Sequence, residues 1–180
     1  MRRSLCALAV LLALAMTAAV AQAASPHFKK GGTPTCRISG TGTSSTSTVC
    51  SGALAGLGGG DVTINTTVSG SAVYQCQNPG GNLSPGQNRV LVGPATTPTM
   101  ISGDEIKNGN LAFTTNAATL SAPSTVSGSA AGCPNPQWTG VNPQLELTSI
   151  ELTIAQGGAT LFTCTASDPN GLSGTVALSC

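Results

Sequence analysis

Charged side chains are scarce in this chain. Lysine, arginine, aspartate and glutamate together make up 7% of the sequence, against about 25% in an ordinary soluble domain. Seven basic residues nearly balance six acidic ones. Binding to nucleic acid needs clustered basic side chains that neutralise phosphates, and the pair Lys29 and Lys30 is too small a cluster for that. We therefore expect no nucleic-acid partner.

Histidine and aromatic residues are also nearly absent. His27 is the only histidine, and aromatic residues make up 3% of the chain. Catalysis by a Ser-His-Asp or Cys-His arrangement needs an imidazole held in place by the surrounding fold. A zinc site needs closely spaced Cys or His pairs such as C-x-x-C, and the sequence has none. We expect no enzyme, no metal and no cofactor.

The few carboxylates leave one catalytic alternative open, because two acids at a fixed separation can hydrolyse a glycosidic bond. Adjacent Asp104 and Glu105 lie in a turn-like segment, so we interpret them as solvated turn charges. A small carboxylate-dependent hydrolase is therefore the function that we rank last. The acids available to it are Asp61, Asp104, Glu105, Glu146, Glu151 and Asp168.

The N-terminus carries the pattern of a signal peptide. Arg2 and Arg3 precede an apolar stretch over residues 5–21, and a small-residue cleavage motif ends at Ala23. We predict that residues 1–23 are removed and that the protein is secreted, with no membrane segment after cleavage. Removal of two basic residues leaves five against six acids, a formal charge of −1.

Cysteine is the residue type that says most about this chain. Six cysteines lie downstream of the signal peptide and a seventh, Cys6, lies within it. In an oxidising compartment such a set predicts structural disulfides, each stabilising the fold by about 3 to 4 kcal/mol through the entropy of the unfolded chain. The six are Cys36, Cys50, Cys76, Cys133, Cys164 and Cys180.

The spacing of the cysteines ranks the fifteen pairings that six of them allow. Two pairs flank short segments with turn signals, at residues 40–43 and at residues 168–171. The remaining pair would form a long-range bridge that we expect to tie two sheets together. The favoured pairs are Cys36 with Cys50, Cys76 with Cys133, and Cys164 with Cys180.

Apolar residues recur with a period of two, which is typical of strands. Val62, Ile64 and Val68 alternate with polar residues, and Pro-Gly clusters at residues 78–81 and 84–87 predict turns. Short, evenly spaced strands predict an all-β fold, an antiparallel β-sandwich of the immunoglobulin-like kind or a barrel. Besides residues 62–68, we expect strands near residues 72–76, 90–92, 99–101, 111–115, 144–155, 159–165 and 175–180.

One predicted strand changes phase part-way along. Leu145 and Leu147 occupy odd positions, whereas Ile150, Leu152 and Ile154 occupy even ones. A β-bulge between the two sets would keep both facing the core. It would also leave the neighbouring glutamates facing solvent.

These patterns define the expected domain organisation. We expect one disulfide-linked β domain over residues 35–180, preceded by a flexible tail over residues 24–34. We expect the protein to be a monomer or to associate weakly.

Two amphipathic aromatic residues remain to be assigned. Tyr74 shares a strand face with Cys76, so we place it in the core beside a disulfide. Trp138 follows two prolines and is a candidate ligand contact, because such side chains anchor glycans or protein partners. Its alternative role is core packing.

The runs at residues 50–60, 76–82, 85–88 and 131–139 resemble small secreted proteins of actinobacteria and related bacteria, which carry six cysteines and much Ser, Thr and Gly. The resemblance covers most of the mature chain and implies secretion and a disulfide-linked fold. Its motifs are turns and cysteines, so it implies no catalytic residue.

The sequence as a whole favours a non-catalytic secreted protein, a structural or surface-associated component of the extracellular space. An extracellular binding module for a glycan or a protein is the main alternative. The two differ in whether the surface carries a ligand site.

Overall fold

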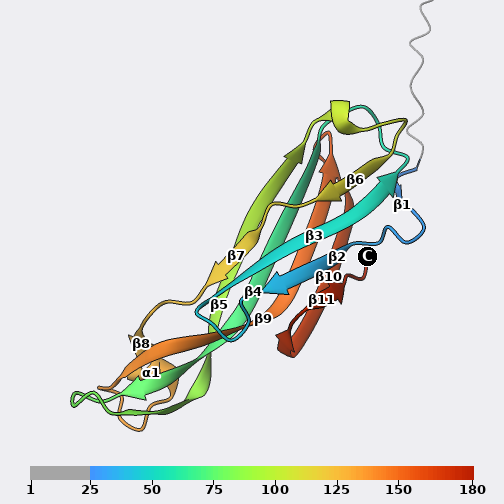
Figure 1. Cartoon of the computed structure of the whole chain (residues 1–180). Coiled ribbons are helices and arrows are strands. Elements are labelled where there is room, and N and C mark those ends of the chain that lie inside the picture. Colours follow the sequence, from blue (N-terminus) through green and yellow to red (C-terminus); the bar gives the residue numbers. More distant parts are fainter. Residues whose placement is uncertain (1–24) are drawn as a thin grey trace, which may run out of the picture.

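Two antiparallel β-sheets pack face to face, so the expected antiparallel β-sandwich is confirmed (Figure 1). The structure is a computed structural model and describes residues 25–180; the expected signal peptide lies outside the described residues. The first sheet contains β1 (His27–Phe28), β2 (Thr35–Ser39), β3 (Ser45–Ala55), β6 (Leu111–Thr114), β7 (Ala118–Ser121) and β11 (Thr175–Ala177).

Apart from the two-residue strand β8, the second sheet is built from longer strands. Two short helices, η1 (Gly103–Glu105) and α1 (Gly128–Ala131), lie in its connections, and no helix in residues 25–180 is long and apolar enough to cross a membrane. Its strands are β4 (Val62–Gln77), β5 (Leu83–Ile101), β8 (Val126–Ser127), β9 (Thr139–Gln156) and β10 (Ala159–Leu172).

Long strands β4, β5 and β9 give the molecule its elongated shape. Figure 1 shows them continuing past β3 and β7 to the end that carries β8 and α1. The first sheet does not cover this end of the second sheet, which we call the extension. The place where the first sheet stops covering it is the waist.

Side chains on one face of β4 fill the space between the sheets, because buried and less buried residues alternate along this strand. Val62, Ile64 and Val68 are fully buried, as are Ala72 and Cys76 further along the same strand. Because side chains of a strand alternate between faces, one run of even-numbered residues supplies the middle of the core. The two strands predicted at residues 62–68 and 72–76 are therefore one continuous strand.

The predicted bulge in β9 is confirmed. The register of β9 against β4 shifts between Ser149, opposite Ser69, and Leu147, opposite Gly70. One extra residue, Thr148, absorbs the change of phase, so that the leucines before it and the isoleucines after it are all buried.

All three favoured disulfides are present, but their roles differ from those we expected. Cys36–Cys50 joins neighbouring strands β2 and β3 within one sheet, and Cys76–Cys133 joins β4 to the segment after α1. The bridge that ties the two sheets together is Cys164–Cys180, between β10 and the segment after β11. Cys164 and Cys180 have the spacing expected of a hairpin, but their disulfide connects a strand of the second sheet to the segment that follows a strand of the first.

Two predicted turns are wrong, because both lie inside strands. Residues 84–87 belong to β5, and residues 168–171 belong to β10. In each place the partner strand shows a register shift, between Val73 and Gln75 of β4 and opposite the stretch Ser167 to Leu172 of β10. Proline and glycine mark bulges here, where a strand can lose a ladder hydrogen bond.

The flexible tail expected over residues 24–34 also differs from the structure. His27–Phe28 forms β1 on the edge of β3, and the Phe28 ring lies 4.5 Å from the ring of Phe162 in the second sheet, centroid to centroid. Gly32 and Pro34 are buried. The segment is held by the pairing of β1 with β3 and by the packing of Phe28 against the core.

Candidate functional site

Tyr74 fixes the structure of the waist. Its side chain lies in the core on the face shared with Cys76, as predicted, and its hydroxyl donates a hydrogen bond to the carbonyl of Pro123 at 2.9 Å. Burial raises the pKa of Tyr74 above its ordinary value, because the charged phenolate would be poorly solvated there. The hydrogen bond holds the connection between β7 and β8 against the second sheet.

Both strands beside Tyr74 bulge at the same level. On β9 the register passes from Val141 to Gln144, so Asn142 and Pro143 have no partner on β4. On β5 it passes from Pro85 to Arg89. Bulges that cluster at one level bend a sheet and redirect its side chains, and here they open the surface around Tyr74.

Asn142 has a backbone conformation that few residues adopt. Its φ angle is 51°, in the left-handed region that asparagine tolerates better than most residues. The following Pro143 has no backbone N–H to contribute to a ladder. The Asn-Pro pair thus interrupts β9 without ending it.

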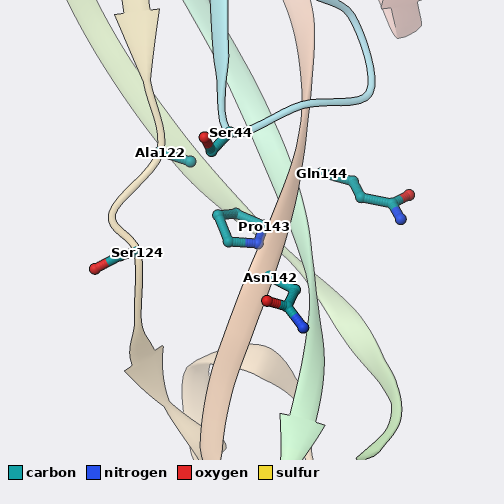
Figure 2. Close-up of a pocket in the computed structure, with 6 residues that line it drawn as sticks. All are labelled: Ser44, Ala122, Ser124, Asn142, Pro143 and Gln144. Atoms are coloured by element: carbon teal, nitrogen blue, oxygen red, sulfur yellow. The ribbon is translucent and has the colours of Figure 1, made fainter.

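Two hollows meet at this bulge. The larger, of about 460 Å³, lies between β9, the start of β3 and the β7–β8 connection, and Figure 2 shows the Pro143 ring on its side of β9 and the Gln144 side chain on the other. It is lined by Ser44, Ala122, Ser124, Asn142, Pro143 and Gln144. We call these six residues the waist groove.

The smaller hollow, of about 190 Å³, adjoins the waist groove and shares Asn142 and Gln144 with it. Gln75 also lines this hollow, and the Asn142 amide donates a hydrogen bond to its side-chain carbonyl at 2.8 Å. We call Gln75, Asn142 and Gln144 the amide cluster. It brings three uncharged side chains, each with donors and acceptors, to one part of the surface.

No charged side chain lines either hollow. The nearest charges in the strand register are Arg89, opposite Val73, and Glu146, opposite Ser71. These two form the single ion pair found within residues 25–180, and both are about half exposed. The waist is therefore an uncharged site beside a neutralised pair.

Trp138, the candidate ligand contact of the sequence, lies elsewhere. It is half-buried and packs against the edge of the core after α1, and it lines neither hollow. Its backbone N–H donates to the carbonyl of Asn135 at 3.0 Å. The structure thus places Trp138 where packing uses much of its surface.

The titratable residues are dispersed. Asp61 accepts a hydrogen bond from the backbone N–H of Gly103, and Asp168 accepts one from that of Asn170. Glu146 is paired with Arg89. Within residues 25–180 no group of three or more His, Cys, Asp and Glu side chains is placed to hold a metal ion.

The waist residues were not singled out from the sequence. The Asn142–Pro143 dipeptide is a strand breaker that marks a bulge, and it was the available signal. Ser44 and Ser124 meet it only through the fold, since they lie about 100 and 20 residues away along the chain.

The fold and the waist together define a disulfide-linked antiparallel β-sandwich with an uncharged polar groove. No family model and no curated protein matches the chain. It is similar to two solved structures, a glycosyl hydrolase family 2 member from Bacteroides cellulosilyticus (11% identity, TM-score 0.40) and the β-glucuronidase of Bacteroides uniformis (13%, 0.34). Each similarity covers 79% of this chain, which spans 14% of either solved chain.

Proposed function

We propose that this protein is a non-catalytic component of the extracellular space, structural or surface-associated. The observation that carries the proposal is the complete use of the six downstream cysteines in three intramolecular bridges. Such bridges form and persist in oxidising compartments. An exterior of short hydroxylated side chains with few charges fits a surface exposed to extracellular proteases.

The use of the acids supports a non-catalytic role. A glycosidase holds two carboxylates at a fixed separation in a cleft. Here Asp61 accepts from the distant Gly103 N–H, Asp168 accepts from the nearby Asn170 N–H, and Glu146 pairs with Arg89. None of the six acids lines the waist groove.

The test is fractionation of cultures of the native host into medium, cell-surface wash and cell interior. We expect the oxidised protein, cleaved after Ala23, in the medium or the surface wash. Full-length protein with reduced thiols in the cell interior would contradict the proposal. Loss of a hydrolytic activity on Glu151→Gln or Asp168→Asn would contradict its non-catalytic part.

A second candidate function, an extracellular binding module, is favoured by the waist groove. Its volume of about 460 Å³ falls in the range of about 300 to 1,000 Å³ that is typical of ligand sites. Arrays of immobilised glycans and peptides, probed with the folded protein, test this function. Saturable binding supports it, and the absence of binding on both arrays contradicts it.

A further inference from the structure

We propose that the waist groove and the amide cluster form a binding site for an uncharged glycan chain. The inference rests on the second function above and specifies its ligand class and its residues. Asn142 and Gln144 belong to both hollows. A ligand that contacts them can therefore extend from the waist groove across β9 to Gln75.

The amide cluster has the hydrogen-bonding chemistry that sugar hydroxyls require. A carboxamide presents two donors and a two-lone-pair acceptor in one plane, and a sugar hydroxyl is both donor and acceptor. The hydrogen bond from Asn142 to Gln75, at 2.8 Å, orients both amides and uses one donor and part of one acceptor. The remaining groups, with the hydroxyls of Ser44 and Ser124, are free to bind a ligand.

The groove also offers apolar surface of the right kind. The Pro143 ring and the Ala122 methyl group lie on the side of β9 that faces Ser44 (Figure 2). Small apolar faces of this type can cover the C–H groups of a pyranose, and burial of that surface contributes to affinity. The Gln144 amide lies on the opposite side of β9 from this apolar surface (Figure 2).

The site is held in place before a ligand arrives. Asn142 and Gln144 belong to β9, which pairs with β4 on either side of the bulge, and the Tyr74 hydroxyl anchors the connection that carries Ala122 and Ser124. Asn142 and Gln75 are already hydrogen-bonded to each other, so these two side chains lose less conformational freedom on binding than unconstrained ones do. A low entropic cost matters most for a neutral ligand such as a sugar, because it makes few strong contacts that could offset a larger cost.

Charge and backbone argue against other ligand classes. No cation lines the hollows to bind a phosphate or a uronic acid. A peptide that added as a strand would meet a short free edge, because β8 pairs with β9 at Thr139 and Gly140 and the Thr43 carbonyl accepts from the Leu145 N–H at 2.8 Å. Pro143 removes one more donor from that edge.

The experiment is a titration of the ¹⁵N-labelled mature protein followed by NMR. The probes are cellohexaose, mannohexaose and chitohexaose, with hexagalacturonic acid and an uncharged hexapeptide as the charged and peptide alternatives. We expect at least one neutral hexasaccharide to shift the side-chain amide resonances of Gln75, Asn142 and Gln144. The acid and the peptide should leave these resonances in place.

A matched pair of variants assigns the binding to Asn142. Asn108 and Asn142 are the two non-glycine residues with positive φ within residues 25–180, each at 51°, so glycine keeps the backbone of either and removes only its side chain. We expect Asn142→Gly to weaken binding of the neutral hexasaccharide at least tenfold and Asn108→Gly to change it less than twofold. Gln144→Ala, which leaves the bulge intact, should weaken it as well.

Four results would overturn the proposal, the last being no binding at all. The first is equal affinity of Asn142→Gly and Asn108→Gly, and the second is shifts confined to residues outside both hollows. The third is preference for hexagalacturonic acid or the peptide, which would leave a binding function but remove its glycan ligand. No binding of any probe would also reject the site, whereas the fractionation test above would still report on secretion.

Discussion

At the scale of single residues, Tyr74 combines a buried ring with a satisfied hydroxyl. Because burial raises the pKa of Tyr74, the folded protein is still mostly protonated at pH 10.0, where an ordinary tyrosine is half deprotonated. The unfolded chain then binds fewer protons than the folded one. The free energy of unfolding must therefore fall as the pH rises from about 10 through the folded pKa.

We predict that this loss of stability at high pH depends on Tyr74. It is the only tyrosine, so ultraviolet absorbance of the tyrosinate reports its titration directly. Urea unfolding at several pH values should show the fall in the wild type and a weaker fall in Tyr74→Phe. Titration of the folded protein at or below pH 10.0 would contradict the account.

Three buried threonines behave in the opposite way, since their hydroxyls are not satisfied. The Oγ1 atoms of Thr46, Thr48 and Thr66 have no hydrogen-bond partner among the described residues, and all three side chains are buried. A buried hydroxyl without a partner destabilises the fold by about 1 to 3 kcal/mol. Threonine is nevertheless compatible with a strand because it is β-branched.

Replacement of Thr66 by valine should therefore stabilise the protein. We expect Thr66→Val to raise the free energy of unfolding by about 1 kcal/mol, measured by urea denaturation. Thr119→Val, on the exposed face of β7, is the control and should change it by less than about 0.5 kcal/mol. A destabilised Thr66→Val would mean that the hydroxyl has a partner, such as a buried water.

At the scale of elements, β5 is an edge strand that stays paired through a bulge. Gly86 makes this bulge feasible, because a Cβ atom there would lie 2.5 Å from the carbonyl oxygen of Tyr74 and 2.7 Å from that of Ala131. Both atoms belong to the backbone and cannot move aside easily. Glycine is required here by close approach of three chain segments.

Gly86→Ala should consequently displace β5 from the waist. We expect the free energy of unfolding to fall by about 1 to 3 kcal/mol, with broadened resonances around Tyr74. Gly59→Ala provides the control, because a Cβ atom at Gly59 meets nothing within 4 Å. Equal stability of the two variants would exclude the close approach.

The elements also show where local sequence patterns reach their limit. Alternation predicted the buried face of β4 and the bulge in β9, because both depend only on which side chains are apolar. The Pro-Gly signal at residues 84–87 predicted a turn, since a turn and an edge bulge share the same local chemistry. What separates them is the pairing of β5 with β4, which is a long-range property.

At the scale of the whole molecule, both sides of the sandwich are closed. On one side the Asn116 side chain donates to the carbonyl of Pro98 at 3.0 Å, and its backbone N–H donates to the Thr99 hydroxyl at 2.7 Å. On the other, Cys164–Cys180 links β10 to the segment after β11. The spacing of the cysteines predicted the pair Cys164–Cys180 but not that it joins the two sheets, and it gave no signal for Asn116, because sheet membership had to be known first.

We predict that the Cys164–Cys180 bridge holds the second of these sides. Two backbone hydrogen bonds, at 2.8 and 2.9 Å, join Thr165 and Ser179 beside it. In Cys164→Ala/Cys180→Ala their amides should exchange with solvent much faster, and the free energy of unfolding should fall by about 3 kcal/mol. Cys36→Ala/Cys50→Ala removes a bridge of similar sequence separation, 14 against 16 residues.

That control should leave the exchange of Thr165 and Ser179 slow, because Cys36–Cys50 lies within one sheet. Retained protection of these amides without Cys164–Cys180 would show that the hydrogen bonds close the sandwich by themselves. The candidate site could not be predicted from local sequence for the same reason: Ser44 and Ser124 lie near Asn142 only when both sheets are assembled.

The central proposal is that three disulfides cross-link a secreted β-sandwich. Non-reducing peptide mapping by mass spectrometry tests it most directly. The protein should be taken from the medium of its native host and digested at acidic pH, which prevents exchange of thiols. The account predicts a mature chain that begins after Ala23, without free thiols, and with bridges Cys36–Cys50, Cys76–Cys133 and Cys164–Cys180. Free cysteines or a different pairing would contradict it.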